Sequence, residues 1–590
     1  MGIKRSFING LLFSTILISG WALAKADDRE IQTPPNFVVI LTDDQGFDDF
    51  GQNGQHPYLE TPNLDTLRKE SVRLTNYRVM PVCAPTRAAL LTGRHPWRAG
   101  VTVVGYGWSF IKLDEVLFPE VLQEHGYRTG MWGKWHCGLS DGYYPWERGF
   151  EEAYMTQGYE YRNNFGFLNS MENRVDHRKY SMEALSDYAI DFIERNQDEP
   201  FCAYLPYITP HSEYVAIPPL WRKYKQKGLS SNLAKLYGTL EFFDTQLGKV
   251  LGKLEELGLD ENTVIIFHSD NGPNLTNAST GALSPEEWAI RNPSKLRGNK
   301  ANTWENGIRT PCFVRWKGTL EPKEVSVPTG VSDLFPTIME LAGIDYQTAK
   351  QQDGKSLVPL LRESSEKSPE YEALENRYYA TSHQAVVFQG RRDKNLPFPD
   401  DYRNVVRFED QSLVCIRGGF KLIQNPIQHH HPFTPQPETD AEHFVLIDLK
   451  NDPTESTNVI EQHPELADEM KSALKEWFSD VVADKNFGKR PEFIVGYQQK
   501  EKATVSVRSA SQVGGHFTNV SPTFKEGGDF GEFQLVIQKP GAWEVSLAHA
   551  QANGNGELQV TIGDQSHTIQ PTGTLTKVGE FVLSDIGERS

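Results

Sequence analysis

Four short apolar runs, each leading directly into reactive polar residues, constrain the fold of this chain more than any other feature. The runs span residues 36–42, 127–134, 201–208 and 262–269. Their β-branched content and apolar character on both faces predict buried strands. Helix-like stretches such as 61–71 and 233–258 lie between them. This alternation predicts an α/β fold in which helices cover a mostly parallel sheet.

Reactive side chains gather at the ends of all four runs. They are Asp43, Asp44, Lys134, His136, His211, Asp270 and Asn271. In an open α/β sheet, ligands bind beyond the carboxyl ends of the strands. Polar residues at four separate strand ends therefore predict one functional site at that edge of the sheet.

Four of these residues offer only oxygen atoms to a metal ion. They are Asp43, Asp44, Asp270 and Asn271. Oxygen ligands without thiolate or imidazole favour Ca²⁺ or Mg²⁺ over zinc. The alternative is that the "DD" and "SDNG" segments are ordinary turns that follow strands, since Asp, Asn and Gly favour turns.

Cys83 lies between two prolines in "PVCAPTRAALLTGRHP". It has three interpretations: a buried packing residue, half of a disulfide, or a nucleophile. The chain has five cysteines, an odd number, so at least one stays unpaired or is modified. A chain of 590 residues with so few cysteines is not built on a disulfide scaffold.

The segment "CAPTR" followed by "AALLTGRHP" resembles the signature of the type I sulfatases. "LTDDQGFDDFG", "GKWHCG", "SDNG" and "KLRGNKANTWENGIRTP" are similar to further motifs of that family, in the same order, over about residues 35–480. The resemblance implies an alkaline-phosphatase-like fold. It also implies that a maturation enzyme oxidises Cys83 to 3-oxoalanine (Cα-formylglycine), whose hydrate attacks the sulfate ester.

The resemblance assigns a role to each candidate site residue. Asp43, Asp44, Asp270, Asn271 and the modified Cys83 would hold one Ca²⁺, with Mg²⁺ the less favoured ion. Arg87 would pair with the modified residue or its carboxylate neighbours, and Lys134 and Lys300 would clamp the sulfate oxygens. His211 would protonate the leaving alcohol, and His136 would take the proton whose loss expels sulfate.

The chain divides into four expected parts. They are a signal peptide (1–26), a catalytic α/β domain (27–380), a smaller α+β subdomain (381–495) and an appended β-sandwich (500–590). The first part combines basic residues, an apolar run and small residues at a cleavage site, which predicts a periplasmic or secreted protein. No later segment reads as a membrane span. The sandwich resembles carbohydrate-binding modules, although such domains also serve as spacers, and its abrupt last strand favours a longer protein.

The secretion signal and the sandwich that resembles carbohydrate-binding modules point to the substrate class. A formal net charge of −18 argues against nucleic acid as a partner. The sequence therefore predicts an exported sulfatase acting on a sulfated polysaccharide or oligosaccharide. Two alternatives stay open: a phosphonate or phosphate monoester hydrolase of the same fold, and an inactive glycan-binding protein with an unmodified cysteine.

Overall fold

The structure is a computed structural model that describes most of the chain. The described residues are 34–51, 56–104, 108–157, 165–212, 214, 217–277, 281–362, 368–383, 385, 403, 405–426, 437–505, 510, 512–514, 524, 527–548, 556–572 and 574–584. The expected signal peptide, residues 1–26, lies outside them. Among the described helices, none combines the length and the apolar character needed to cross a bilayer.

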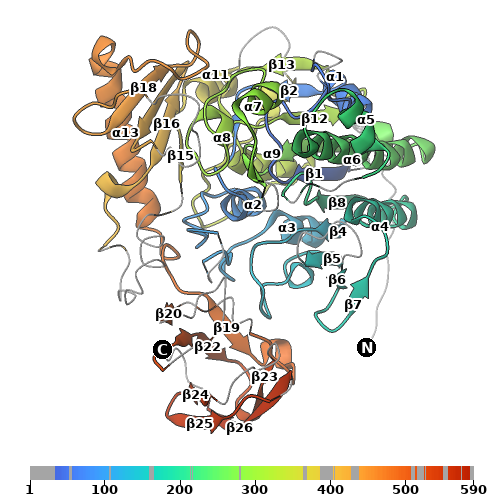
Figure 1. The fold of residues 1–590 in the computed structure, drawn as a ribbon, viewed down its shortest axis with the longest axis vertical. Coiled ribbons are helices and arrows are strands. Elements are labelled where there is room, and N and C mark those ends of the chain that lie inside the picture. The colour runs from blue at the N-terminus through green and yellow to red at the C-terminus, as the bar shows by residue number, and fades with distance from the viewer. Residues whose placement is uncertain are drawn as a thin grey trace, which may run out of the picture.

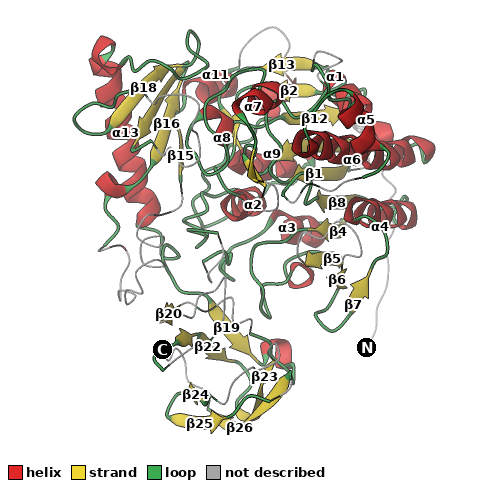
Figure 2. Ribbon diagram, in the orientation of Figure 1, coloured by secondary structure: helices red, strands yellow, loops and turns green. Residues whose placement is uncertain are grey.

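A ten-stranded sheet forms the centre of the larger part of the molecule (Figures 1 and 2). Its strands are β1 Asn36–Thr42, β2 Val72–Leu74, β4 Arg128–Gly133, β5 Glu152–Gln157, β6 Phe165–Leu168, β7 Arg174–Asp176, β8 Phe201–Pro206, β9 Thr263–Ser269, β12 Cys312–Trp316 and β13 Lys323–Val325. They follow the order β13-β2-β12-β9-β1-β8-β4-β5-β6-β7. The central strands β9, β1, β8, β4 and β5 are parallel. Antiparallel pairing of β12, β6 and β7 makes the whole sheet mixed.

The four predicted strands are the four adjacent central strands β9, β1, β8 and β4. All seven residues of β1 are buried, because parallel strands with neighbours on both edges and helices on both faces have no contact with water. Since these strands run in the same direction, their carboxyl ends meet at one edge. The predicted α/β class is thereby confirmed.

Helices cover both faces of the sheet, and β1 contributes alternate side chains to each side. Phe37, Val39 and Leu41 pack in one apolar cluster with helices α2, α3, α9 and α10. Val38 and Ile40 pack in a second cluster with α1, α4 and α6. The helix bounds are α1 Pro62–Lys69, α2 Cys83–Thr92, α3 Phe118–Glu124, α4 Ser181–Arg195, α5 Leu220–Gln226, α6 Ser231–Glu256, α7 Pro285–Arg291, α8 Glu305–Ile308, α9 Leu334–Leu341, α10 Val358–Arg362 and α11 Pro369–Asn376.

A four-stranded antiparallel sheet follows in the C-terminal part of the chain. It consists of β15 Tyr379–Ser382, β16 Leu413–Arg417, β17 Phe420–Gln424 and β18 Phe444–Asp448, in that order. Helix α13 Pro464–Val482 packs on one face. The other face packs on Trp304 and Ile308, at the two ends of helix α8 in the larger part of the molecule.

The strands beyond residue 490 form a separate lobe at the bottom of Figure 1. They are β19 Glu492–Val495, β20 Gln512–Gly514, β21 Phe530–Glu532, β22 Gln534–Ile537, β23 Gly541–Ala548, β24 Leu558–Ile562, β25 Gln565–Ile569 and β26 Leu575–Leu583. They pair two by two, and the sheets β23–β26 and β24–β25 share an apolar cluster around Phe581 and Trp543. The parallel pair β19–β22 joins residues on both sides of position 500. The domain boundaries stay a prediction.

A substitution at Gly133, the last residue of β4, tests how tightly the carboxyl ends of β4 and β8 pack. A Cβ at this position would lie 2.0 Å from the Pro206 carbonyl oxygen, and the backbone φ is 144°. We expect Gly133→Ala to destabilise the protein by about 1–3 kcal/mol, because strand β8 must move. The urea midpoint of unfolding measures this.

Gly252→Ala is the matched control. Gly252 lies within α6, and a Cβ there meets nothing within 4 Å. This change should stabilise the protein by about 0.5–1 kcal/mol, because alanine is the better helix former. An unfolding midpoint for Gly133→Ala at or above that of the unchanged protein would contradict the tight packing of β4 on β8.

Candidate active site

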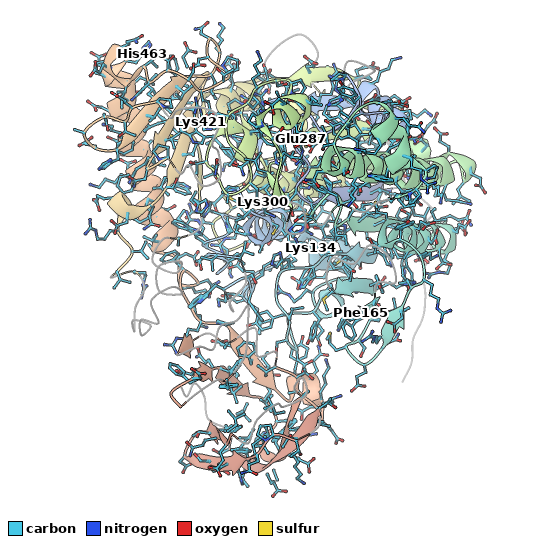
Figure 3. The ribbon with its side chains drawn as sticks, in the orientation of Figure 1. Lys134, Phe165, Glu287, Lys300, Lys421 and His463 are labelled. Atoms are coloured by element: carbon cyan, nitrogen blue, oxygen red, sulfur yellow. The ribbon has the colours of Figure 1, made fainter. Side chains whose placement is uncertain are left out.

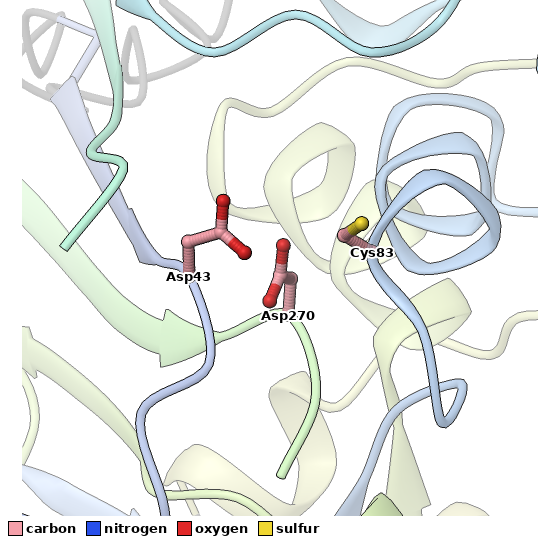
Figure 4. A group of neighbouring side chains, drawn as sticks. All are labelled: Asp43, Cys83 and Asp270. Carbon is pink, nitrogen blue, oxygen red and sulfur yellow. The ribbon is translucent and has the colours of Figure 1, made fainter. Parts of the chain in front are cut away.

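All the predicted site residues come together at the carboxyl edge of the central sheet. Strands β1, β4, β8 and β9 deliver the residues that follow them, helix α2 delivers Cys83 and Arg87, and a segment between α7 and α8 delivers Lys300. Figure 4 shows Asp43, Asp270 and Cys83 pointing toward one another from three different elements. The potential ligand atoms of these three residues lie within 4.8 Å of one another.

Cys83 is the first residue of helix α2 and is 3% exposed. The N-terminus of a helix carries a partial positive charge, which favours an anion at this position. The helix ends at Gly93, whose left-handed conformation (φ 67°) suits glycine. The Sγ atom of Cys83 lies 3.3 Å from Nδ1 of His136. The five cysteines, all described residues, are free of disulfides.

Several buried oxygen atoms of the site have no hydrogen-bond partner among the described residues and could ligate a cation. Within the described structure, Oδ1 of Asp43, Oδ2 of Asp44 and Oδ1 of Asn271 accept no hydrogen bond. The side-chain nitrogen of Asn271 donates to Oδ1 of Asp44 at 2.7 Å, which fixes the orientation of the amide. Buried oxygens left without partners are costly, and hard oxygen donors are the ligands that Ca²⁺ prefers. The residues present therefore fit a calcium ion.

The two carboxylates beside Cys83 have opposite pKa shifts. Burial alone raises the pKa of Asp43, but the charges of Lys134, His211 and Arg87 outweigh burial and lower that pKa below its ordinary value. Burial and the charge of Asp43 raise the pKa of Asp270 well above its ordinary value, although Arg87 opposes the shift. A divalent cation bound here would favour the charged form of both groups.

Three cationic side chains contact the aspartates of the site directly. Arg87 donates to Oδ2 of Asp270 through Nε at 3.1 Å and Nη2 at 2.8 Å. The Nζ atom of Lys134 lies 2.6 Å from Oδ2 of Asp43. Lys300 reaches Oδ1 of Asp44 at 2.5 Å. The carboxylates thus position the ammonium groups of Lys134 and Lys300, which both lie near the centre of the molecule (Figure 3).

The two histidines of the site, His136 and His211, are half-buried. His136 contacts Cys83, and burial and the charge of Lys134 lower its pKa well below the ordinary value. Its backbone φ is 63°, a strained conformation typical of functional sites. The Nδ1 atom of His211 lies 2.8 Å from the Ser212 carbonyl oxygen, and its Nε2 atom lies 3.7 Å from Oδ2 of Asp44.

Sequence reasoning missed the ion pair that supports the loop after β1. Arg291 donates to Oδ2 of Asp49 at 2.7 Å, and the same guanidinium donates to the backbone oxygen of Asp44 at 3.4 Å. Both side chains are buried. The two partners are 242 residues apart, so no local pattern joins them; only the second acid pair of "TDDQGFDD" hinted at a role for Asp49.

Comparison with known proteins agrees with this geometry. The Sulfatase family model matches residues 35–344. Steryl-sulfatase of Rattus norvegicus is 30% identical over 419 residues, which cover 55% of this chain and 70% of that protein.

Two solved structures share the fold. The crystal structure of Ps i-CgsB in complex with k-i-k-neocarrahexaose has a TM-score of 0.60 and 24% identity, covering 78% of this chain and 95% of its own. The structure of BT4656 in complex with its substrate D-glucosamine-2-N,6-O-disulfate has a TM-score of 0.54 and 18% identity, covering 78% and 100%. The family match extends over more than half of the chain and includes every residue of the site. The chain therefore belongs to the sulfatase family and is a sulfuric ester hydrolase.

Proposed function

We propose that this sulfatase is exported and removes sulfate from a sulfated polysaccharide or oligosaccharide, using Cys83 in its formylglycine form and one Ca²⁺. The observation that carries the proposal is the convergence of Cys83, Asp43 and Asp270 within 4.8 Å, beside buried oxygens that have no other partner. Neither a packing cysteine nor a set of ordinary turns accounts for that convergence.

The bound calcium and the hydrated aldehyde would supply a nucleophilic hydroxyl and stabilise negative charge on the sulfate group. Asp43, Asp44, Asp270 and Asn271 would hold the ion. A maturation enzyme would install the aldehyde at Cys83.

Arg87 holds a carboxylate of the site in place, and the two lysines would bind the sulfate group. Arg87 fixes Asp270 through two hydrogen bonds and donates to the Lys134 carbonyl oxygen at 2.8 Å. It therefore ties the first turn of α2 to strand β4. Lys134 donates to Asp43 and Lys300 donates to Asp44, and a lysine ammonium, with three N–H donors, would also donate to sulfate oxygens.

The histidines move protons at opposite ends of the reaction. His136 lies 3.3 Å from the Cys83 side chain, so it would accept the proton whose loss releases sulfate. The Nε2 atom of His211 lies 3.7 Å from Oδ2 of Asp44, and His211 would donate a proton to the leaving alcohol, as a general acid does.

Two observations support a carbohydrate substrate and an extracellular or periplasmic location. Two proteins that share this fold were solved with a sulfated sugar or a neocarrahexaose. The first residues of the chain have the pattern of a secretory signal. An exported hydrolase meets the sulfated polymers that surround cells.

The modification of Cys83 is directly measurable. Replacing the thiol by an aldehyde removes one sulfur and two hydrogens and adds one oxygen, so the tryptic peptide should be about 18 Da lighter, as the activated nucleophile requires. Cys83→Ala should retain the fold and lose turnover by at least about 10³-fold. Cys202→Ala, a buried cysteine on β8, is the control and should retain activity. Active enzyme with an intact Cys83 thiol would contradict the mechanism.

Calcium should stabilise the protein through the oxygen set. At a calcium concentration about a hundredfold above Kd, binding adds about 2.7 kcal/mol to the free energy of unfolding. A thermal shift with added Ca²⁺ measures this, and Asn271→Ala should abolish most of it. Asn262 donates to the Pro34 carbonyl oxygen at 3.3 Å and lies at the opposite end of β9 from Asp270, so Asn262→Ala should respond to calcium like the unchanged protein. An undiminished calcium response in Asn271→Ala would place the ion elsewhere.

Matched ester substrates separate the proposal from the phosphate alternative. We expect the enzyme to hydrolyse an aryl sulfate faster than the corresponding aryl phosphate, because two lysines and one metal suit the lower charge of a sulfate monoester. The value of kcat/KM for each ester, and then for defined sulfated oligosaccharides, measures this. Faster phosphate turnover would overturn the choice of ester, and binding of oligosaccharides without any turnover would favour a glycan-binding protein.

A further inference from the structure

The segment that carries Lys300, residues 297–305, is held at both ends by one residue, Glu455. At its start, Nε of Arg297 donates to the Glu455 carbonyl oxygen at 2.8 Å. At its end, the backbone N–H of Glu305 donates to Oε2 of Glu455 at 2.6 Å. Glu455 has a backbone φ of 53°, a conformation that costs a non-glycine residue free energy. This conformation directs both its carbonyl and its carboxylate toward the same segment.

A buried charge network fixes the Glu455 side chain. The Nζ atom of Lys421 lies 2.7 Å from Oε1 of Glu455 and 2.9 Å from Oε1 of Glu305. Glu305 in turn accepts two hydrogen bonds from Arg78, at 3.0 and 2.9 Å. All four side chains are fully buried. Arg309 lies 3.8 Å from Glu305 as a further cation, and a buried charge is tolerated only with such partners.

The network joins the C-terminal sheet to the active site. Lys421 belongs to β17, and Figure 3 shows it on the C-terminal sheet while Lys300 lies toward the centre of the molecule. The face of that sheet opposite α13 packs on Trp304 and Ile308, which flank Glu305. Apolar contacts and ion pairs therefore hold the same segment from the same side.

Between its two ends, the segment contacts the loop after β9 and the chain just before Cys83. The backbone N–H of Lys300 donates to the carbonyl oxygen of Pro273 at 2.9 Å, two residues after Asn271. The N–H of Ala301 donates to the Pro81 carbonyl at 2.8 Å, next to Cys83. The side chain of Lys300 then reaches Asp44. A shift of the segment would move the Lys300 ammonium relative to both.

We infer that Glu455, with Lys421 as its charge partner, is a positioning residue that holds Lys300 in the active site across the boundary between the catalytic part and the C-terminal sheet. This inference rests on the proposed role of Lys300 in binding sulfate. Glu455 touches neither substrate nor metal, and it acts only through the segment that it clamps.

A double-mutant cycle tests this with the full-length enzyme and a small aryl sulfate ester. Glu455→Ala should lower kcat/KM on the order of 10²-fold, because misplacement of a binding group by about 1 Å has such an effect. In a Lys300→Ala background the same change should cost about twofold or less, since two residues that act as one unit are not additive. Equal losses in both backgrounds would show a merely structural role and overturn the inference, as would no loss in either.

Arg377→Gln is the matched control for the loss of a buried ion pair. Arg377 pairs with Asp333 at 2.9 Å, outside the Lys300 segment. Its effect on kcat/KM should be the same in both backgrounds, within about twofold. If Lys300→Ala alone retains full activity, the proposed role of Lys300 fails; if it loses activity while Glu455→Ala does not, only the positioning inference fails.

Hydrogen exchange provides a readout that does not depend on activity. Glu455→Gln keeps an acceptor for the Glu305 N–H, so this variant should fold even where the alanine variant does not. It removes the charge with which Lys421 fixes the side chain, so the clamp should loosen. The amides of Lys300 and Ala301 should exchange faster in this variant, while those of β12 stay protected. Unchanged protection at Lys300 and Ala301 would contradict the clamp.

Discussion

The burial of two adjacent carboxylates at the end of β1 is the constraint on which the rest of the site depends. Asp43 and Asp44 are at most 1% exposed, and charges so far from water must be compensated within the protein. Lys134 and Lys300 each provide one compensating contact, and oxygens that still lack partners leave room for a metal ion. The arrangement of cations around the site follows from this need.

Much of the fold could be predicted from the sequence because its signals are local. The strand at 36–42 is apolar on both faces, and the structure pairs it on both edges as β1. The helix predicted over 233–258 is α6, residues 231–256. Polar residues after parallel strands had to meet, since such strands end at one edge. This geometry is why Asp43 and Asp270, which follow β1 and β9, lie close together, whereas the place of Cys83 beside them followed only from the family resemblance.

The contacts that the sequence did not predict join residues far apart in the chain. The pairing of Arg291 with Asp49 spans 242 positions, and nothing near either residue specifies the other. The mixed edges of the sheet, with β12 antiparallel to β9, also depend on tertiary packing and not on the pattern of the strand itself. The same holds for Lys421 and Glu305, which read locally as surface charges but are fully buried.

The parallel pairing of β1 has a consequence for how the chain folds during synthesis. Its neighbours in the sheet are β8 and β9, which end at Pro206 and Ser269. A nascent chain therefore carries an apolar strand with two unpaired edges until β8 has left the ribosome, and with one unpaired edge until β9 has followed. Such long-range pairing slows folding and exposes the chain to aggregation. The central sheet should consequently depend on chaperones that shield this strand until its partners arrive.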